Sequence, residues 1–478
     1  MTQAERAELE RWIEMIYEKA LELGLDPFPV HFEVVPAHVI YELSAYGLPA
    51  RFSHWTFGRD YHVQKTMYEY GISRIYELVF NTDPAQAYLL DVNDMVAHKL
   101  VIAHVYAHSD FFKNNIYFEH TDRRMVDRAR LHAERIREYE MRYGPLVVEQ
   151  FLDAVLSIEE HIDPVLPTYG APPRKPEPAE PEPAGDTFED VFYMVQPKPK
   201  PEPKKHKIPE EPQKDLLLFI RDHSRVLEDW QRDIISMIRE EMIYFLPQIK
   251  TKILNEGWAS LWHERILENL PLTPEEHVYF RKLHSAVIQP TSRLSLNPYY
   301  VGYKILRDIE RRWNGELEPG EEETDWMGFR IERPVGQGLQ KLFEVRTLEC
   351  DQTFLHKYLT EKLVRELDLY TYRLEERNGE LVWVVDETDW RVVRNTLVDS
   401  LTNFGVPVIT VEDGDWEHRG ELYLKHHYDG KPLDMQRTTR CLRYIVKLWG
   451  RPVHLETVID NERTLISCDG NSITQRTL

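Results

Sequence analysis

Two histidines four residues apart are the strongest chemical signal in this sequence. His104 and His108 stand in the apolar stretch VIAHVYAHSDFF, which has helical periodicity. One helical turn places both imidazoles on one face, where they can share a cation. The related His-Glu-x-x-His pair of zinc peptidases carries a catalytic glutamate, but Val105 occupies that position here. The alternative is a pair of structural histidines inside a packed helix, and the spacing alone does not decide between the two.

A candidate third ligand, Glu256, stands about 150 residues later in the stretch NEGWASLWH. On a helix Glu256, Ser260 and His263 share one face. Several zinc peptidases take their third ligand from a glutamate on a second helix, often in a Glu-Gly-Trp-Ala type of sequence. We therefore predict that His104, His108 and Glu256 bind a divalent metal, zinc in the first place, with an open position for water or substrate. We count Glu256 and His263 among the catalytic candidates.

Such a site also needs a general base, and Glu42 is our preferred candidate. It follows His38 by one turn in AHVIYELSAYGLP and has apolar neighbours. Partial burial there would raise its proton affinity, which favours general-base catalysis at neutral pH. Glu159 and Glu160 beside His161 are alternatives. For each of these carboxylates the simpler interpretation is a solvated helix face.

Two further clusters offer groups for substrate binding. Arg51, His54 and Trp55 combine an aromatic wall with a guanidinium fork, which suits a substrate that carries a carboxylate. Lys113 and Asn114 add polar groups at the expected end of the histidine helix. The alternatives are an aromatic-capped loop for the first cluster and helix capping for the second.

Helices are expected to position most of these residues. Apolar residues recur at three- and four-residue spacing through much of the first 165 residues and again after residue 214. Fourteen of the 30 prolines fall between Pro164 and Pro212 among charged residues, which is typical of an extended linker. We therefore predict four regions: a helical, histidine-rich region (1–165), a proline-rich linker (166–213), a helical region that packs on the first (214–324) and an α+β domain (325–478).

The last region alternates short β-rich runs with two helical windows. The expected strands are 381–385, 408–411, 421–426, 452–458 and 463–468, and the expected helices are 390–403 and 435–449. This order suits a ferredoxin-like sheet with helices on one face. The predicted fold class is a mainly α N-terminal body, interrupted by a proline-rich linker, with a smaller α+β C-terminal domain.

Composition excludes several classes of function. The formal charge of −22 argues against a nucleic-acid partner. No apolar run is long enough for a membrane span, and no export signal is visible, so we expect a cytoplasmic protein. The three cysteines lie far apart and predict neither disulfides nor a cysteine zinc site. Phosphate-binding loops and the serine-hydrolase elbow are absent from the sequence, so no nucleotide cofactor is expected.

Several long stretches resemble the SpoVR family (stage V sporulation protein R). The stretches that carry this resemblance are PARFSHWTFG (49–58), YELVFNTDPAQAYLL (76–90), VIAHVYAHSDFFKNN (101–115), the segment 227–263 that ends in NEGWASLWH, and the segment 284–313. Together they span most of the first 313 residues.

The resemblance implies a role in forming the spore cortex, the modified peptidoglycan of a dormant cell. It further implies action on peptidoglycan stem peptides or muropeptides, with formation of γ-glutamyl amide bonds, and a place in the mother cell during sporulation. A metal that polarises the γ-carbonyl would serve amide formation and hydrolysis alike, because both share one tetrahedral transition state. The alternative is a non-catalytic assembly protein of sporulating cells, whose C-terminal domain recruits a protein partner.

Overall fold

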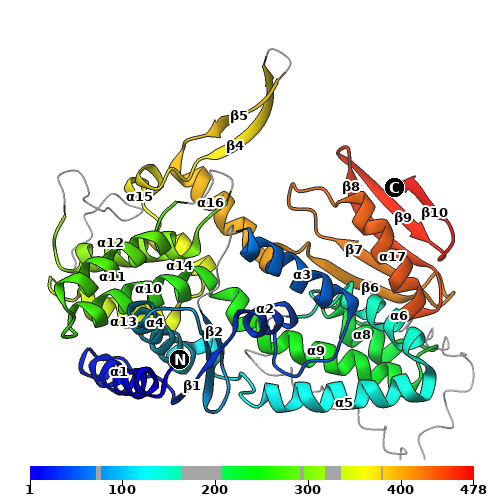
Figure 1. The fold of residues 1–478 in the computed structure, drawn as a ribbon. Coiled ribbons are helices and arrows are strands. Elements are labelled where there is room, and N and C mark those ends of the chain that lie inside the picture. The colour runs from blue at the N-terminus through cyan, green and yellow to red at the C-terminus, as the bar shows by residue number, and fades with distance from the viewer. Residues whose placement is uncertain (71–76, 164–206, 291–294, 318–334, 378–379) are drawn as a thin grey trace, which may run out of the picture. The chain divides into compact units, whose positions relative to one another are not determined.

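The computed structural model describes residues 1–70, 77–163, 207–290, 295–317, 335–377 and 380–478 (Figure 1). These residues form two compact units. The first contains Met1–Glu149 and Glu240–Val406, and the second contains Gln150–Arg239 and Pro407–Leu478. The predicted linker, 166–213, lies mostly outside the described residues.

Helices make up most of the first unit. Its helices are α1 (Gln3–Glu22), α2 (Ala37–Tyr46), α3 (Trp55–Glu69), α4 (Met95–Asn114), α5 (Met125–Tyr143), α10 (Lys252–Glu268), α11 (Pro274–Val287), α12 (Pro298–Trp313), α13 (Gly338–Leu348), α14 (Asp351–Tyr358), α15 (Glu361–Glu366) and α16 (Trp390–Ser400), with short 3₁₀ turns η1 (Ile116–Phe118) and η3 (Thr402–Gly405). Two helices, α6 (Pro145–Leu156) and α9 (Asp229–Lys250), cross from one unit to the other.

Helices α4 and α10 lie side by side in the core of the first unit (Figure 1). Every residue of α4 from Ala97 to Phe112 is buried, including polar and charged residues such as Lys99 and Asp110. Asp94 caps this helix by accepting a hydrogen bond from the Ala97 N–H. Helix α10 is buried almost as completely, because α4, α11, α12 and α13 all pack against it.

Two small sheets complete the first unit. In the sheet β1-β3-β2, strand β3 (Ala85–Leu90) pairs in parallel with β1 (Val30–Val35) and antiparallel with β2 (Glu77–Phe80). Strands β2 and β3 contact α4, so the edge strand β2 reaches the histidine helix. The second sheet is a hairpin of β4 (Thr371–Arg377) and β5 (Glu380–Glu387).

The second unit contains a five-stranded sheet. Its strands are β6 (Ile409–Trp416), β7 (Glu421–His426), β8 (Val453–Ile459), β9 (Glu462–Cys468) and β10 (Ile473–Thr477), in the order β10-β9-β8-β7-β6. Helix α17 (Met435–Trp449) connects β7 to β8, which form the parallel pair, and packs on β8 and β9. Helix α8 (Leu216–His223) packs against β6.

The predicted fold class, a mainly α body with a smaller α+β C-terminal domain, is confirmed. The ferredoxin-like arrangement is not found, because the five strands follow one another in space in their chain order. The first predicted strand became β5, which pairs with β4, and the first predicted helix became α16, which packs on α14 and α15. The second unit consists of two stretches of chain, and its C-terminal stretch begins at Pro407. The prediction placed the start of the α+β domain at 325.

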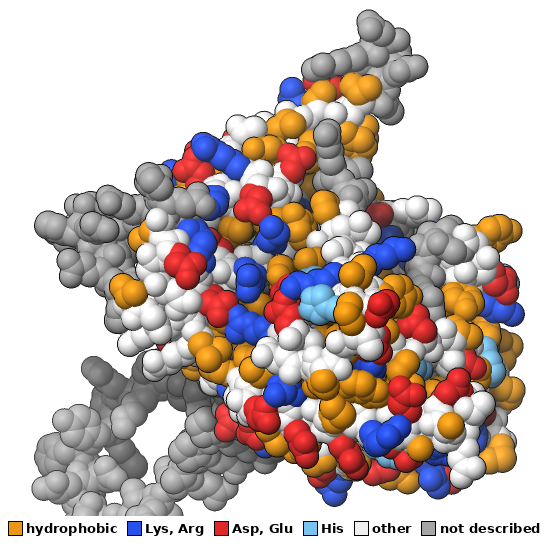
Figure 2. Space-filling model, turned by 60° about the vertical axis from the view of Figure 1, so that its left-hand side comes forward, with side chains coloured by type: hydrophobic (Ala, Val, Ile, Leu, Met, Phe, Trp, Pro, Cys, Tyr) orange, Lys and Arg blue, Asp and Glu red, His pale blue; other side chains and the backbone are white. Residues whose placement is uncertain are grey.

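Among the described residues, no helix is both long enough and apolar enough to cross a membrane. On the face drawn in Figure 2, the acidic and basic side chains of the described residues are interspersed.

Candidate metal centre

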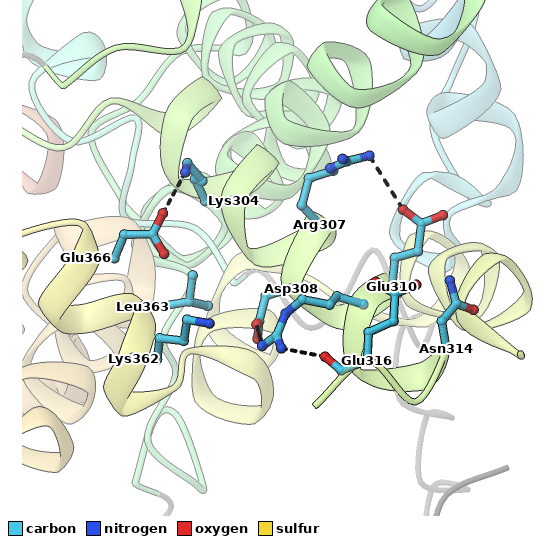
Figure 3. A pocket seen from close by; sticks show the side chains of 10 residues that line it. Lys304, Arg307, Asp308, Glu310, Asn314, Glu316, Lys362, Leu363 and Glu366 are labelled. Atoms are coloured by element: carbon cyan, nitrogen blue, oxygen red, sulfur yellow. Dashed lines mark hydrogen bonds and ion pairs between the residues drawn. The ribbon is translucent and has the colours of Figure 1, made fainter. Parts of the chain in front are cut away.

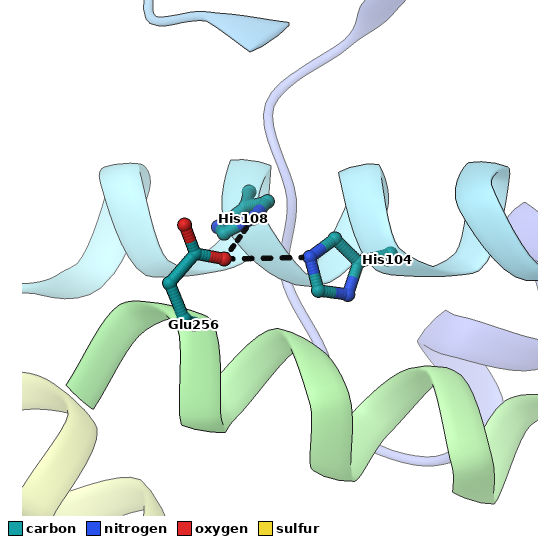
Figure 4. Close-up of side chains that lie close together, drawn as sticks. All are labelled: His104, His108 and Glu256. Carbon is teal, nitrogen blue, oxygen red and sulfur yellow. Dashed lines mark ion pairs between the residues drawn. The ribbon is translucent and has the colours of Figure 1, made fainter. Parts of the chain in front are cut away.

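The structure brings His104, His108 and Glu256 together between the two core helices (Figure 4). The Glu256 Oε2 atom lies 3.6 Å from His104 Nε2 and 3.4 Å from His108 Nε2. All three candidate ligand atoms lie within 4.8 Å of one another. Zinc binds such atoms at about 2 Å, so a cation between them needs little rearrangement. The spatial cluster expected from the sequence is present, and its binding of a metal stays a proposal.

Unsatisfied polar atoms in this cluster fit a cation. His104 Nε2 and Glu256 Oε2 are buried and have no hydrogen-bond partner among the described residues. Such atoms are costly unless something pairs with them. His108 Nδ1 lies 2.9 Å from the Asn255 Oδ1 atom, which can only accept, so Nδ1 carries the proton. His108 Nε2 is therefore the nitrogen that faces Glu256.

The electrostatics of the cluster favour the protonation states that metal ligands need at His104 and Glu256, but not at His108. Burial, assisted by the neighbouring His108, lowers the pKa of His104 to about 4, so this imidazole is neutral. Burial alone would raise the pKa of Glu256, but its contacts with both imidazoles hold that pKa far below the usual value. Burial disfavours the charged form of His108, yet Glu256 outweighs it and raises the His108 pKa. A proton therefore competes with a cation for His108.

The residues around Glu256 explain most of the stretch NEGWASLWH. Asn255 orients His108, as described above. Gly257 meets Gly302 of α12 at backbone contact, where a Cβ atom would lie 2.4 Å from the Gly302 carbonyl carbon. The Trp258 indole N–H donates to Asp110 on α4. The stretch thus fixes α10 against α4 and α12 and directs Glu256 at the two imidazoles.

His263, predicted as catalytic, lies behind His104 instead of beside Glu256. Its Nδ1 atom is 3.0 Å from His104 Nδ1, and its Nε2 atom is 2.8 Å from His284 Nδ1. Each of its contacts is thus with another imidazole. From this position His263 can orient the ring of His104.

Glu77 and Tyr299 are two residues of this site that sequence reasoning missed. Glu77, on the edge strand β2, is half-buried; desolvation raises its pKa to about 7, with a smaller contribution from the charge of Glu256 that His108 opposes. The Tyr299 ring stacks on His104 at 5.9 Å between centroids. The nearby charge of Glu256 and burial raise the Tyr299 pKa well above its usual value, so the phenol keeps its proton. Both residues lie in stretches that carry the family resemblance, but no spacing rule connects them to the histidines.

Glu42, the base predicted from the sequence, lies elsewhere in the first unit. It is exposed on α2, without the partial burial that we expected, because Ile40 and Tyr41 supply the inward face of this helix. Together with Arg51 it lines a separate cavity of about 360 Å³. Its catalytic role stays a prediction.

The predicted substrate-binding residues make structural contacts. Arg51 forms an ion pair with the buried Glu241 at 2.6 Å, and the buried His54 is the N-cap of α3, where its Nδ1 atom lies 2.7 Å from Thr56 Oγ1. Trp55 is 52 % exposed.

At the end of α4, Lys113 and Asn114 also make contacts within the protein. Lys113 pairs with Asp26 at 2.6 Å, and the Asn114 side chain donates to the Asp110 and Asp26 carbonyl oxygens. None of these recorded contacts is with His104, His108 or Glu256, and substrate binding by these residues stays a prediction.

A second cavity, of about 410 Å³, lies between α12 and α15 (Figure 3). Its charged side chains pair with one another: Lys304 with Glu366 at 2.6 Å, and Arg311 with Asp308 at 2.7 Å. Charges neutralised in this way leave little for a charged ligand, so we place no site there.

The features above define a class of protein: a helical body whose two central helices share a buried His₂Glu cluster, followed by an α+β unit. The chain belongs to the SpoVR family. The family described as "SpoVR like protein" matches residues 3–406, and the "SpoVR-like C-terminal domain" matches residues 407–460. The junction between the two matches coincides with the boundary between Val406 and Pro407 in the structure. The resemblance seen in the sequence is thereby confirmed.

A curated relative is the "Uncharacterized protein YcgB" of Escherichia coli (strain K12). It is 30 % identical over 461 residues, which cover 90 % of this chain and 88 % of that protein. No solved structure matches the chain.

Proposed function

We propose that this protein is a metal-dependent enzyme of amide-bond chemistry, and that it acts on γ-glutamyl carbonyls of peptidoglycan stem peptides. The observation that carries the proposal is the convergence of His104 Nε2, His108 Nε2 and Glu256 Oε2, two of them without a hydrogen-bond partner among the described residues. The substrate class comes from the family resemblance.

His104, His108 and Glu256 would hold a divalent cation through two imidazole nitrogens and one carboxylate oxygen. This donor set suits zinc, and three protein ligands leave a position open for a substrate. When bound, the cation would polarise the amide carbonyl.

Glu77 supplies the acid–base group in this proposal. A carboxyl group whose pKa is raised to about 7 can accept a proton from an attacking amine or water and return it to the leaving amine. A positive charge near Glu77 favours the ionised carboxylate, which is the form that accepts a proton.

Tyr299 supplies a hydrogen-bond donor. Because the charge of Glu256 and burial raise its pKa, the hydroxyl stays protonated at neutral pH and can donate to an oxygen that becomes negative in the transition state. Its ring, stacked on His104, fixes the direction of the donor.

The proposed reaction is an exchange: one amide bond breaks, another forms with a second amine, and one amine is released. No nucleotide is consumed, which agrees with the absence of phosphate-binding loops from the sequence. The choice between amine transfer and hydrolysis depends on whether water reaches the carbonyl.

Glu77→Gln is expected to lower kcat for the exchange by about 10²–10⁴-fold, because the amide cannot accept a proton. The assay uses zinc-loaded protein, muropeptides and an added primary amine, with mass spectrometry of the exchanged and hydrolysed products. Zinc content and melting temperature are measured on the same preparations to show that site and fold are retained.

Glu42→Gln is the matched comparison, because Glu42 is the base predicted from the sequence. We expect the larger loss in Glu77→Gln. If Glu77→Gln keeps the full rate and Glu42→Gln has no activity, the base is Glu42 and not Glu77. Zinc-loaded wild type that leaves every muropeptide unchanged would contradict the proposed function.

A further inference from the structure

Three histidine rings and one carboxylate form a continuous chain behind the candidate metal centre. His104 Nδ1 lies 3.0 Å from His263 Nδ1, and His263 Nε2 lies 2.8 Å from His284 Nδ1. The remaining nitrogen, His284 Nε2, is 3.6 Å from Glu264 Oε1. Helices α4, α10 and α11 each contribute at least one of these side chains. All four are buried.

Such a chain has two arrangements of its protons. A neutral imidazole donates through one nitrogen and accepts through the other. The tautomer of one ring therefore fixes the tautomer of the next. In one arrangement every N–H points toward Glu264, and His104 Nε2 keeps a free lone pair. In the other every N–H points toward His104, whose Nε2 then carries a proton and cannot bind a cation.

Glu264 distinguishes between the two arrangements. Its Oε2 atom accepts from the Tyr303 hydroxyl at 2.7 Å, and its Oε1 atom accepts from Arg281 at 2.7 Å. Both oxygen atoms of Glu264 therefore act as acceptors. Glu264 Oε1 lies 3.6 Å from His284 Nε2, a buried nitrogen with no hydrogen-bond partner among the described residues, so a proton on Nε2 would face this acceptor.

We propose that Glu264, acting through His284 and His263, holds His104 in the tautomer that binds the metal. The three residues are positioning residues, because none of them belongs to the group of candidate ligands, and His263 meets His104 only at its Nδ1 atom. This inference rests on the proposed metal centre and extends it by two rings and a carboxylate.

Glu264→Gln tests this role, because an amide keeps the volume but removes the charge and can donate to His284. Zn²⁺ affinity is measured by competition with a chromogenic chelator, and we expect it to fall about 10–100-fold. The matched control is Glu268→Gln, one turn further along α10. Glu268 also pairs with Arg281 but has no recorded contact with His284. The control should bind Zn²⁺ like the wild type.

His284→Phe breaks the same chain at another point and should lower the affinity by the same factor. Because both changes act through one chain, the double variant should lose little more than either single variant, whereas independent structural effects would multiply. His284→Phe also serves as the test if Glu264→Gln does not fold. In metal-free wild type, ¹⁵N spectra of labelled histidine should show His104 protonated at Nδ1, and this signal should change in Glu264→Gln but not in Glu268→Gln.

The outcomes separate this inference from the proposed function. Wild type that binds one Zn²⁺ with Glu264→Gln unchanged in affinity would overturn the positioning role and leave the metal centre intact. A second Zn²⁺ that binds to the wild type and is lost in His284→Phe would also overturn it, since His284 would then be a ligand. Wild type that binds no Zn²⁺ would refute the metal centre, and the positioning role with it.

Discussion

Glu256→Gln is expected to lower zinc affinity by about a thousandfold or more, roughly 4 kcal/mol, and to abolish exchange activity. The substitution keeps the shape of the side chain but removes the one negative charge among the three candidate ligands. The metal-free variant should melt within a few degrees of the metal-free wild type, since about 1 kcal/mol corresponds to only ~2–4 °C in domains of moderate size. Loss of the carboxylate also removes a contact that raises the His108 pKa, so the neutral form of this buried ring is favoured.

Glu268→Gln on the same helix controls for the loss of a carboxylate as such. Affinity is measured by chelator competition and activity by the muropeptide exchange assay. Full zinc content together with full activity in Glu256→Gln would refute the assignment of Glu256 as a ligand.

Gly302→Ala is expected to destabilise the protein by about 3 kcal/mol, at the upper end of the usual cost of overpacking. A Cβ atom at this position would lie 2.1 Å from the Ile253 carbonyl oxygen and 2.8 Å from the Gly257 Cα atom. Both are backbone atoms, so no side-chain rotation relieves the contact, and α12 must move away from α10. Because Glu256 is adjacent to Gly257, zinc affinity should fall as well.

Gly58→Ala is the matched control for this prediction. Gly58 is also inside a helix, α3, but a Cβ atom there would have no neighbour within 4 Å. Alanine should therefore stabilise the protein by roughly 0.5–1 kcal/mol through its higher helix propensity. Urea unfolding of the three proteins measures both effects. Equal stability of Gly302→Ala and wild type would contradict the close packing of α10 on α12.

Local periodicity predicted the parts of the site that follow from helix geometry. The four-residue spacing of His104 and His108 requires only one helical turn, and the structure has that helix. Glu256 was assigned from its sequence neighbours, whose contacts in the structure explain why they accompany it: Asn255 orients His108, and Gly257 permits the close approach of α12.

The remaining site residues depend on tertiary contacts that no single stretch encodes. Glu77 belongs to a short edge strand, and its proximity to the cluster follows from the packing of β2 against α4. His284 and Tyr299 come from α11 and α12, at positions that helical periodicity does not distinguish from ordinary core residues. Glu42 had a plausible apolar context in the sequence, but its neighbours are buried on the other side of α2.

The C-terminal unit shows the same limit. Strands β7, β8 and β9 were predicted within one residue of their observed bounds, because short β-rich runs are a local pattern. The pairing of the strands with one another was not predicted. Within the described residues β4 and β5 pair only with each other. Strand β5 is therefore not part of the C-terminal sheet, in which the prediction had placed it.

The most direct test of the metal centre is zinc K-edge X-ray absorption on the wild-type protein, purified without a histidine tag. We predict one zinc per chain, with two imidazole nitrogens and carboxylate or water oxygen at about 2.0–2.1 Å and no sulfur ligand. The same measurement on the double variant His104→Ala, His108→Ala should find no bound zinc. Equal zinc content in the two proteins, or a wild type that holds no metal after loading, would contradict the assignment of His104, His108 and Glu256 as a metal centre.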